Sequence, residues 1–96
     1  MRERDFQRLI VEAAGYLGYA VYHTFDSRRS NPGWPDLVLL KQGRMICLEL
    51  KTERGRIRPE QEVWIAALDQ VPGVTARIVR PSQWDQIEAL LKGEPA

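Results

Sequence analysis

Two strands and the turn that joins them are encoded in the stretch DLVLLKQGRMICLELK, residues 36–51. Apolar, β-forming residues fill positions 37–40 and 45–48, and Gln42-Gly43 between them suits a tight turn. The stretch therefore predicts a β-hairpin whose strands cover residues 36–41 and 45–51.

The register of this hairpin decides which side chains meet. If Gln42 and Gly43 form a two-residue turn, the ladder pairs Asp36 with Glu49, so that two carboxylates face each other. Like charges placed directly opposite destabilise a sheet unless something compensates them, and a divalent cation would do so. Lys51 lies two positions beyond Glu49 and shares its face of the strand. The trio outlines a hydrolytic metal site.

Two alternatives are open at this point. Gly43 also suits a three-residue turn with a bulge, which would shift the pairing by one residue and place Asp36 opposite Leu48. The two acids and Lys51 could also form ordinary salt bridges on an exposed strand pair. Residues 37–40 and 46–50 are expected to be buried on both faces, where unpaired carboxylates are costly, and this favours the metal site.

Length and composition favour one small domain over residues 1–96, with 44% hydrophobic and 28% charged residues and a net charge of +1. The single Cys47 cannot form an internal disulfide, which fits a reducing compartment. The sequence contains neither an apolar stretch of about 20 residues nor a signal-peptide pattern. We therefore expect a cytoplasmic protein with no membrane association.

The order of the remaining elements follows from hydrophobic spacing and from turn residues. Apolar residues at helical spacing predict helices over residues 5–17 and 59–70, and β-forming stretches predict strands over 19–25 and 74–79. Ser82 with Asp85 resembles a capping box that opens a last helix through residues 84–91. The resulting order, α-β-β-β-α-β-α, predicts an α/β fold with a mixed central β-sheet flanked by helices.

Two polar residues lie close to predicted apolar faces. Glu12 is at the edge of the first helix's apolar face, where it is either a boundary residue or directed toward the carboxylates. Gln61 is on the inward face of the second helix, and a buried amide needs partners. It either caps neighbouring backbone or helps to hold a water or a metal ion.

Basic residues gather on both sides of the predicted hairpin. Isolated arginine runs are usually solvated loops, but these two flank the carboxylates in sequence, where a polyanion would have to lie. We expect them to contact the phosphates of such a polyanion. The runs are Arg28 with Arg29, and Arg54, Arg56 and Arg58.

A family resemblance is carried by these motifs. Pro35-Asp36 followed by Glu49-Leu50-Lys51 resembles the PD-(D/E)XK nuclease superfamily, whose core has the same element order. The ordered set as a whole is similar to the VRR-NUC family in its small stand-alone form. The other matching residues are Ser30, Gly33, Gly55, Arg56, Pro59, Glu60, Gln61 and Trp64. Trp34 is bulkier than this pattern leads us to expect.

The resemblance implies a restriction-endonuclease-like core and a nuclease that depends on magnesium (Mg2+) or manganese (Mn2+). It implies action on structured DNA, and stand-alone members resemble homodimeric Holliday junction resolvases that cut four-way junctions. The same chemistry could act on flaps, nicks or linear ends. The rivals from other classes are a non-catalytic DNA-binding subunit and a metal-independent protein-interaction domain.

Residue roles are also implied by the resemblance. Asp36, Glu49 and the Leu50 backbone carbonyl would ligate the metal ion, and Lys51 would contact the attacking water or the scissile phosphate. The family's accessory polar positions are matched by Gln61 and Glu12, and Ser30 joins the arginine residues as an expected DNA contact.

Overall fold

The computed structural model describes residues 1–24 and 31–94. Within these ranges the chain forms three α-helices and a four-stranded sheet. The elements are α1 (Glu3–Tyr16), β1 (Ala20–His23), β2 (Leu37–Lys41), β3 (Arg44–Leu50), α2 (Pro59–Asp69), β4 (Val74–Val79) and α3 (Trp84–Leu91). The predicted order and the mixed α/β architecture are confirmed.

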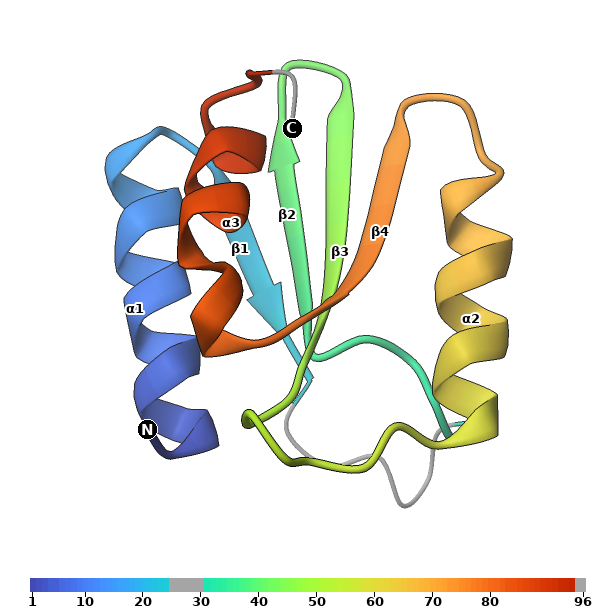
Figure 1. Cartoon of the computed structure of the whole chain (residues 1–96). Coiled ribbons are helices and arrows are strands. Elements are labelled where there is room, and N and C mark those ends of the chain that lie inside the picture. Colours follow the sequence, from blue (N-terminus) through green and yellow to red (C-terminus); the bar gives the residue numbers. More distant parts are fainter. Residues whose placement is uncertain (25–30, 95–96) are drawn as a thin grey trace.

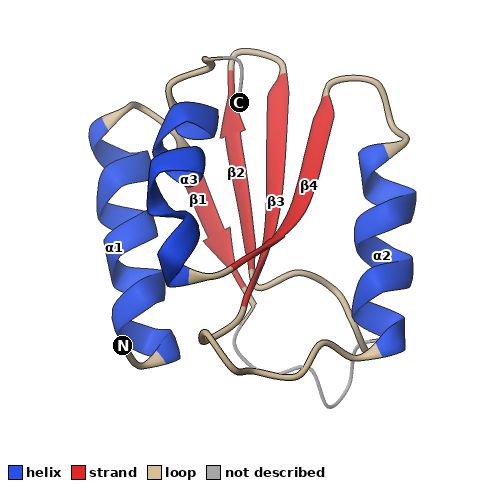
Figure 2. Cartoon of the chain, in the orientation of Figure 1, coloured by secondary structure: helices blue, strands red, loops and turns tan. Residues whose placement is uncertain are grey.

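The sheet has the strand order β1-β2-β3-β4. β2 is antiparallel to both β1 and β3, whereas β3 and β4 are parallel. Parallel neighbours need a crossover connection, and α2 provides it. Helices α1 and α3 lie on one side of the sheet and α2 lies on the other (Figure 1). Figure 2 shows the strands between these two helical layers.

The turn between β2 and β3 resolves the question of register. Gln42 and Gly43 both have positive φ angles, 47° and 79°, as a two-residue type I′ hairpin turn requires. Leu40 pairs with Met45, and the ladder continues to Leu37 opposite Leu48. The bulged alternative is therefore wrong, and the next position of the ladder places Asp36 opposite Glu49.

Apolar side chains form one core on each face of the sheet. The larger core lies under α1 and α3 and includes Phe6, Ile10, Ala14, Tyr19, Leu37, Leu39, Ile46, Leu48, Leu50, Val79, Ile87 and Leu91. The smaller core lies under α2 and consists of Val38, Cys47 and Ala76 with partly buried neighbours. Leu40 was expected to be buried but is 47% exposed, because α2 packs on β3 and β4 and leaves this part of β2 uncovered.

The segment that leads into β2 is packed against the start of α2. The Trp34 and Trp64 rings meet edge to face with their centroids 5.2 Å apart, and the Trp64 indole N–H donates to the Pro32 carbonyl at 3.1 Å. Gly33 has a φ of 97°, and a Cβ atom added there would lie 2.5 Å from the Glu60 carbonyl oxygen. The large Trp34 side chain, unexpected from the sequence pattern, is therefore explained by its packing against Trp64 of α2.

The start of the last helix differs from the prediction. Residues Pro81–Gln83 form a short 3-10 helix before α3, and the Gln83 side chain accepts the Arg80 backbone N–H at 2.8 Å. The Ser82 backbone N–H donates to the Glu53 carboxylate at 2.7 Å. The predicted Ser82 capping box is therefore wrong, because the Gln83 side chain caps the start of the 3-10 helix at Arg80 instead.

Two smaller observations complete the comparison with the sequence. β1 ends at His23, and residue 25, the last of the predicted first strand, lies outside the described residues. Among the helices of residues 1–24 and 31–94, none has the length and apolar content needed to cross a bilayer.

Replacing Gly33 should expose how tightly this segment is packed. Gly33→Ala should lower the free energy of unfolding by about 2 to 4 kcal/mol, because it combines backbone strain with a clash against the Glu60 carbonyl. Gly43→Ala is the matched control: its φ is also positive but its surroundings are open, so about 1 to 2 kcal/mol is expected. Urea unfolding midpoints measure both, and equal losses would contradict the packing account.

Candidate active site

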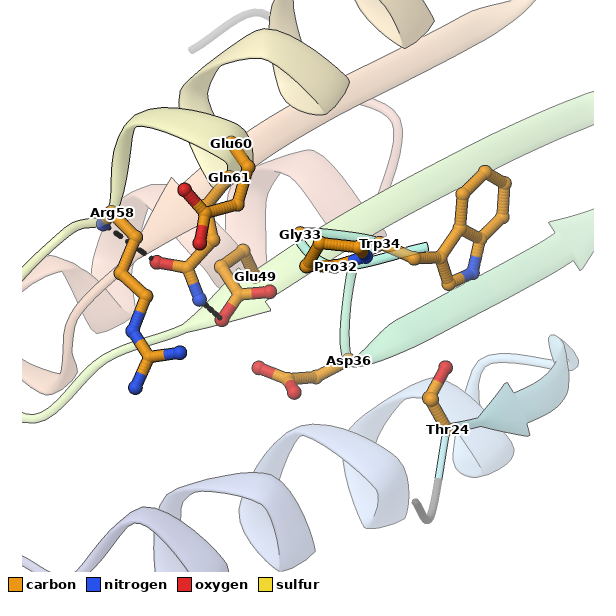
Figure 3. A pocket seen from close by; sticks show the side chains of 9 residues that line it. All are labelled: Thr24, Pro32, Gly33, Trp34, Asp36, Glu49, Arg58, Glu60 and Gln61. Atoms are coloured by element: carbon orange, nitrogen blue, oxygen red, sulfur yellow. Dashed lines mark hydrogen bonds between the residues drawn. The ribbon is translucent and has the colours of Figure 1, made fainter. Parts of the chain in front are cut away.

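A pocket of about 150 Å³ lies at the end of the sheet where β2 begins and β3 ends (Figure 3). Its walls come from the end of β1, the segment before β2, the end of β3 and the first turn of α2. The lining residues are Thr24, Pro32, Gly33, Trp34, Asp36, Glu49, Arg58, Glu60 and Gln61. Segments far apart in the sequence therefore meet at one polar cavity.

Asp36 and Glu49 face each other across this pocket, and Figure 3 shows their carboxylates turned toward one another. Glu49 is only 4% exposed. The Leu50 backbone N–H donates to Asp36 Oδ2 at 2.8 Å, and Gln61 Nε2 donates to Glu49 Oε2 at 3.1 Å. A hydrogen-bond donor thus orients each of the two carboxylates.

Gln61 has two partners that together fix its amide. Its Oε1 accepts the Arg58 backbone N–H at 2.9 Å, and its Nε2 donates to Glu49. Capping of neighbouring backbone, one of the two roles left open by the sequence, is thus observed. The same amide also orients a carboxylate of the pocket.

The two carboxylates are electrostatically coupled. The pKa of Glu49 is raised from its ordinary 4.5 to about 8. The largest cause is burial, followed by the negative charge of Asp36 and a hydrogen bond with Asp36, whereas the positive charge of Lys51 opposes the rise. Glu49 therefore holds a proton at neutral pH unless a cation joins the pair.

Lys51 and Leu50 follow directly on Glu49 at the end of β3. The Lys51 backbone N–H donates to the Val79 carbonyl on β4 at 2.9 Å, whereas the Leu50 N–H points the other way, toward Asp36. The N–H and C=O of one strand residue point to the same neighbour, so the Leu50 carbonyl is also directed to the Asp36 side. The Lys51 charge acts on Glu49 at this same end of the sheet.

Glu3 is a site neighbour that the sequence reading missed. Loss of hydration raises the pKa of Glu3, the charge of Asp36 raises it further, and Lys51 opposes the rise. Glu3 opens α1, and the N-terminal end of that helix lies at the same end of the sheet as the pocket (Figure 1). The apolar spacing of α1 identified its buried face but could not tell which helix end lies near the carboxylates.

Thr24 was also missed. It follows the last residue of β1, its backbone N–H donates to the Asp36 carbonyl at 3.0 Å, and its hydroxyl donates to the Pro35 carbonyl at 3.2 Å. Thr24 therefore ties the end of β1 to the residue that carries the first carboxylate.

Glu12 is not brought to the pocket. It lies nine residues after Glu3, about 13 Å further along the axis of α1, is exposed and does not line the cavity. We therefore leave it out of the site.

The predicted basic residues fall into two groups. Arg54, Arg56 and Arg58 are exposed in the loop between β3 and α2, and Arg58 lines the pocket. The start of this loop is held in place by Arg80, whose Nη1 donates to the Thr52 and Glu53 carbonyls at 2.6 and 2.9 Å. The remaining predicted DNA contacts, Arg28, Arg29 and Ser30, lie outside the described residues.

A family model for the VRR-NUC domain matches residues 6–83. The chain belongs to the VRR-NUC family. The matched range contains Asp36, Glu49, Lys51 and Gln61 and begins just after Glu3. A VRR-NUC domain implies a nuclease-type, DNA-processing function with DNA as the substrate, and nuclease domains of this family generally use divalent metal ions. No curated protein matches the chain in sequence.

The donor set of the VRR-NUC pocket fits a hard divalent cation. Asp36, Glu49 and the Leu50 carbonyl offer only oxygen atoms, which suit Mg2+ or Mn2+ and leave positions for water and phosphate oxygens. Burial and the facing Asp36 charge raise the pKa of Glu49, and a cation between the two carboxylates would favour their ionised forms. The proposed ligands include only two acidic side chains. Among residues 1–24 and 31–94, there is no cluster of three or more His, Cys, Asp or Glu side chains that could hold a metal ion.

The pKa of Glu49 predicts how the stability of the metal-free protein depends on pH. Between pH 4.5 and about 8 the folded protein keeps a proton that the unfolded chain releases, so the free energy of unfolding should fall as the pH rises through this range. The expected loss is on the order of a few kcal/mol. Urea unfolding in the presence of a chelator at pH 5, 6.5 and 8 measures it.

Glu49→Gln should flatten this pH dependence. The control is Glu53→Gln, because Glu53 is an exposed acid whose pKa is lowered by the Ser82 backbone N–H. Its removal should leave the fall between pH 5 and 8 in place. An equally steep fall in Glu49→Gln would mean that another group carries the effect.

Asp36→Asn should separate carboxylate repulsion from metal binding. The substitution keeps an oxygen acceptor for the Leu50 N–H but removes the charge that faces Glu49, so the melting temperature without metal should rise by about 4 °C or more at pH 8. The further rise that Mn2+ gives the wild-type protein should disappear. Thermal melts with chelator and with Mn2+ measure both effects.

The matched control is Asp69→Asn. Asp69 also accepts a backbone N–H, that of Ala76 at 3.0 Å, but it lies outside the pocket. Its Mn2+-dependent shift should equal that of the wild type. A lower melting temperature for metal-free Asp36→Asn would contradict the repulsion account.

Proposed function

We propose that this VRR-NUC protein is an Mg2+- or Mn2+-dependent endodeoxyribonuclease that hydrolyses phosphodiester bonds in branched DNA. Its preferred substrate is the Holliday junction, which it resolves as a homodimer. The observation that carries the proposal is the meeting of Asp36 and Glu49 in a polar pocket beside Lys51. Membership of a nuclease family adds independent support.

Asp36, Glu49 and the Leu50 carbonyl would hold the metal ion, which would supply positive charge at the scissile phosphate and lower the pKa of an attacking water. Gln61 keeps the Glu49 carboxylate turned into the pocket, and the Leu50 N–H does the same for Asp36. These two donors restrict the ligand geometry before DNA arrives.

Lys51 is the residue that acts on the reacting groups. Its ammonium lies near enough to Glu49 to lower that residue's pKa, so it favours the ionised carboxylate. With DNA bound, the same ammonium orients the attacking water and neutralises charge that develops on the phosphate.

Arginine residues position the DNA backbone. Arg58 lines the pocket and contacts a phosphate beside the scissile one, while the exposed Arg54 and Arg56 contact phosphates further along the strand. We also assign phosphate contacts to Arg28, Arg29 and Ser30. Because phosphate contacts carry no base information, the protein selects DNA by shape.

Two copies of the chain act together. The Asp36–Glu49 pocket provides one cutting site per chain, and resolving a junction symmetrically needs two cuts, so a two-fold symmetric dimer would supply both sites.

Cleavage assays with labelled four-way junctions, flaps and linear duplex test the proposal. With Mg2+ or Mn2+ the wild-type protein should place paired symmetric nicks in the junction, and chelator should abolish them. Cleavage of flaps or ends alone would support metal-dependent hydrolysis but contradict the Holliday junction as the substrate. If no substrate is cleaved, the nuclease proposal is wrong and the alternative of a non-catalytic DNA-binding subunit is favoured.

Lys51→Ala should slow cleavage by at least about 100-fold while changing DNA affinity by less than about threefold, because its main interaction is with the reacting groups. Lys92→Ala is the control, since Lys92 follows α3 and pairs with Glu88 at 3.9 Å. It should cleave at the wild-type rate. Full activity of Lys51→Ala would remove Lys51 from the mechanism.

A further inference from the structure

We propose that a second pocket binds one unpaired DNA base, stacked on Tyr22, Trp34 and Trp64, beside the phosphate that is cut. This inference rests on the proposed nuclease function and adds the feature by which the protein selects its DNA.

The second pocket has a volume of about 280 Å³ and adjoins the carboxylate pocket. It is lined by Tyr22, Thr24, Asn31, Trp34 and Trp64. Thr24 and Trp34 line both pockets, so the two cavities share a wall. A strand of DNA with its phosphate at the carboxylates therefore has the second pocket directly beside it.

The strand ladder sets the spacing between the pockets. Tyr22 pairs with Val38 on β2, and two residues later, just past the end of β1, the Thr24 backbone N–H donates to the Asp36 carbonyl. Residues two apart share a face of the sheet, and their rows are separated by about 7 Å. Tyr22 therefore stands on the face that carries Asp36, one row above it, within reach of a base attached next to the scissile phosphate.

The aromatic side chains of this pocket are presented to solvent. Tyr22 is 62% exposed, because α2 packs on β3 and β4 and leaves β1 uncovered on this face. Trp34 and Trp64 are half-buried and hold each other edge to face, and the Trp64 indole N–H is anchored to the Pro32 carbonyl. Figure 3 shows the Trp34 indole extending away from Asp36 and Glu49. The Trp34 and Trp64 rings are thus held in place before a ligand arrives.

The lining matches a nucleobase better than a phosphate. All five lining residues are uncharged and three are aromatic, whereas the neighbouring pocket contains Asp36, Glu49, Glu60 and Arg58. Every base has a π-face that stacks on aromatic side chains, and Thr24 and Asn31 offer hydrogen-bonding groups for a base edge. A base inside a duplex is already stacked and paired, so the pocket favours DNA with an unpaired base at a flap, gap or junction.

Fluorescence of 2-aminopurine tests this inference in the presence of chelator, where cleavage does not interfere. One DNA carries the fluorescent base unpaired at a gap, and a second carries it in a continuous duplex of the same length. The wild-type protein should quench the unpaired base and bind the gapped DNA more tightly. Tyr22→Ala should remove the quenching and weaken binding of the gapped DNA by about 5- to 100-fold.

Two further variants make the result specific. Tyr22→Phe keeps an aromatic face and should restore both quenching and affinity. Tyr16→Ala is the matched control, because Tyr16 is 91% exposed at the end of α1 and belongs to neither pocket. It should behave as the wild type does. Circular dichroism of each variant checks the fold. Because Tyr22 is exposed, its replacement should leave the fold unchanged.

The two proposals fail in different ways. Suppose that the wild-type protein cuts DNA with Mg2+, but that Tyr22→Ala and Tyr16→Ala quench the base equally and bind gapped DNA equally well. This result would overturn the base pocket and support the nuclease proposal. Quenching that depends on Tyr22 in a protein that cuts no DNA would support the base pocket and overturn the catalytic proposal. Binding that ignores the unpaired base altogether would also overturn the base pocket.

Discussion

The antiparallel pairing of β2 with β3 is the constraint on which the site depends. A two-residue turn at Gln42-Gly43 places Asp36 opposite Glu49, and a shift by one residue would turn one of these carboxylates to the other face of the sheet. The pairing is maintained by apolar side chains buried on both faces of the two strands. The energy of the core therefore offsets the repulsion that the facing carboxylates create at the end of the sheet.

The parts of the structure predicted from sequence are those with strong local signals. The hairpin, the helices and the strand order in the chain follow from apolar spacing and turn residues. The pairing of Asp36 with Glu49 follows from counting along the ladder once the turn is chosen. The choice of turn was open because Gly43 suits more than one type, and the positive φ of Gln42, which decides it, leaves no clear mark on the residue type.

What could not be predicted depends on packing between distant segments. Glu3 is near the carboxylates only because α1 packs with its N-terminal end at that end of the sheet, and the same packing keeps Glu12 away. The bulk of Trp34 makes sense only when Trp64 is seen beside it. Ser82 matched a local capping pattern, but the chain forms a 3-10 helix before α3, and the Gln83 side chain bonds to the Arg80 N–H at its start.

The two hydrogen bonds of the Gln61 amide affect how variants at this position are interpreted. Its oxygen accepts the backbone N–H at the start of α2, and its nitrogen donates to Glu49. Gln61→Ala removes both hydrogen bonds, so it destabilises the start of α2 and also removes the donor that orients the Glu49 carboxylate. Gln61→Glu retains the acceptor for the helix but sets a negative charge against Glu49. Neither substitution isolates one role, so the turnover of a Gln61 variant has to be compared with its folding stability before a chemical role is assigned.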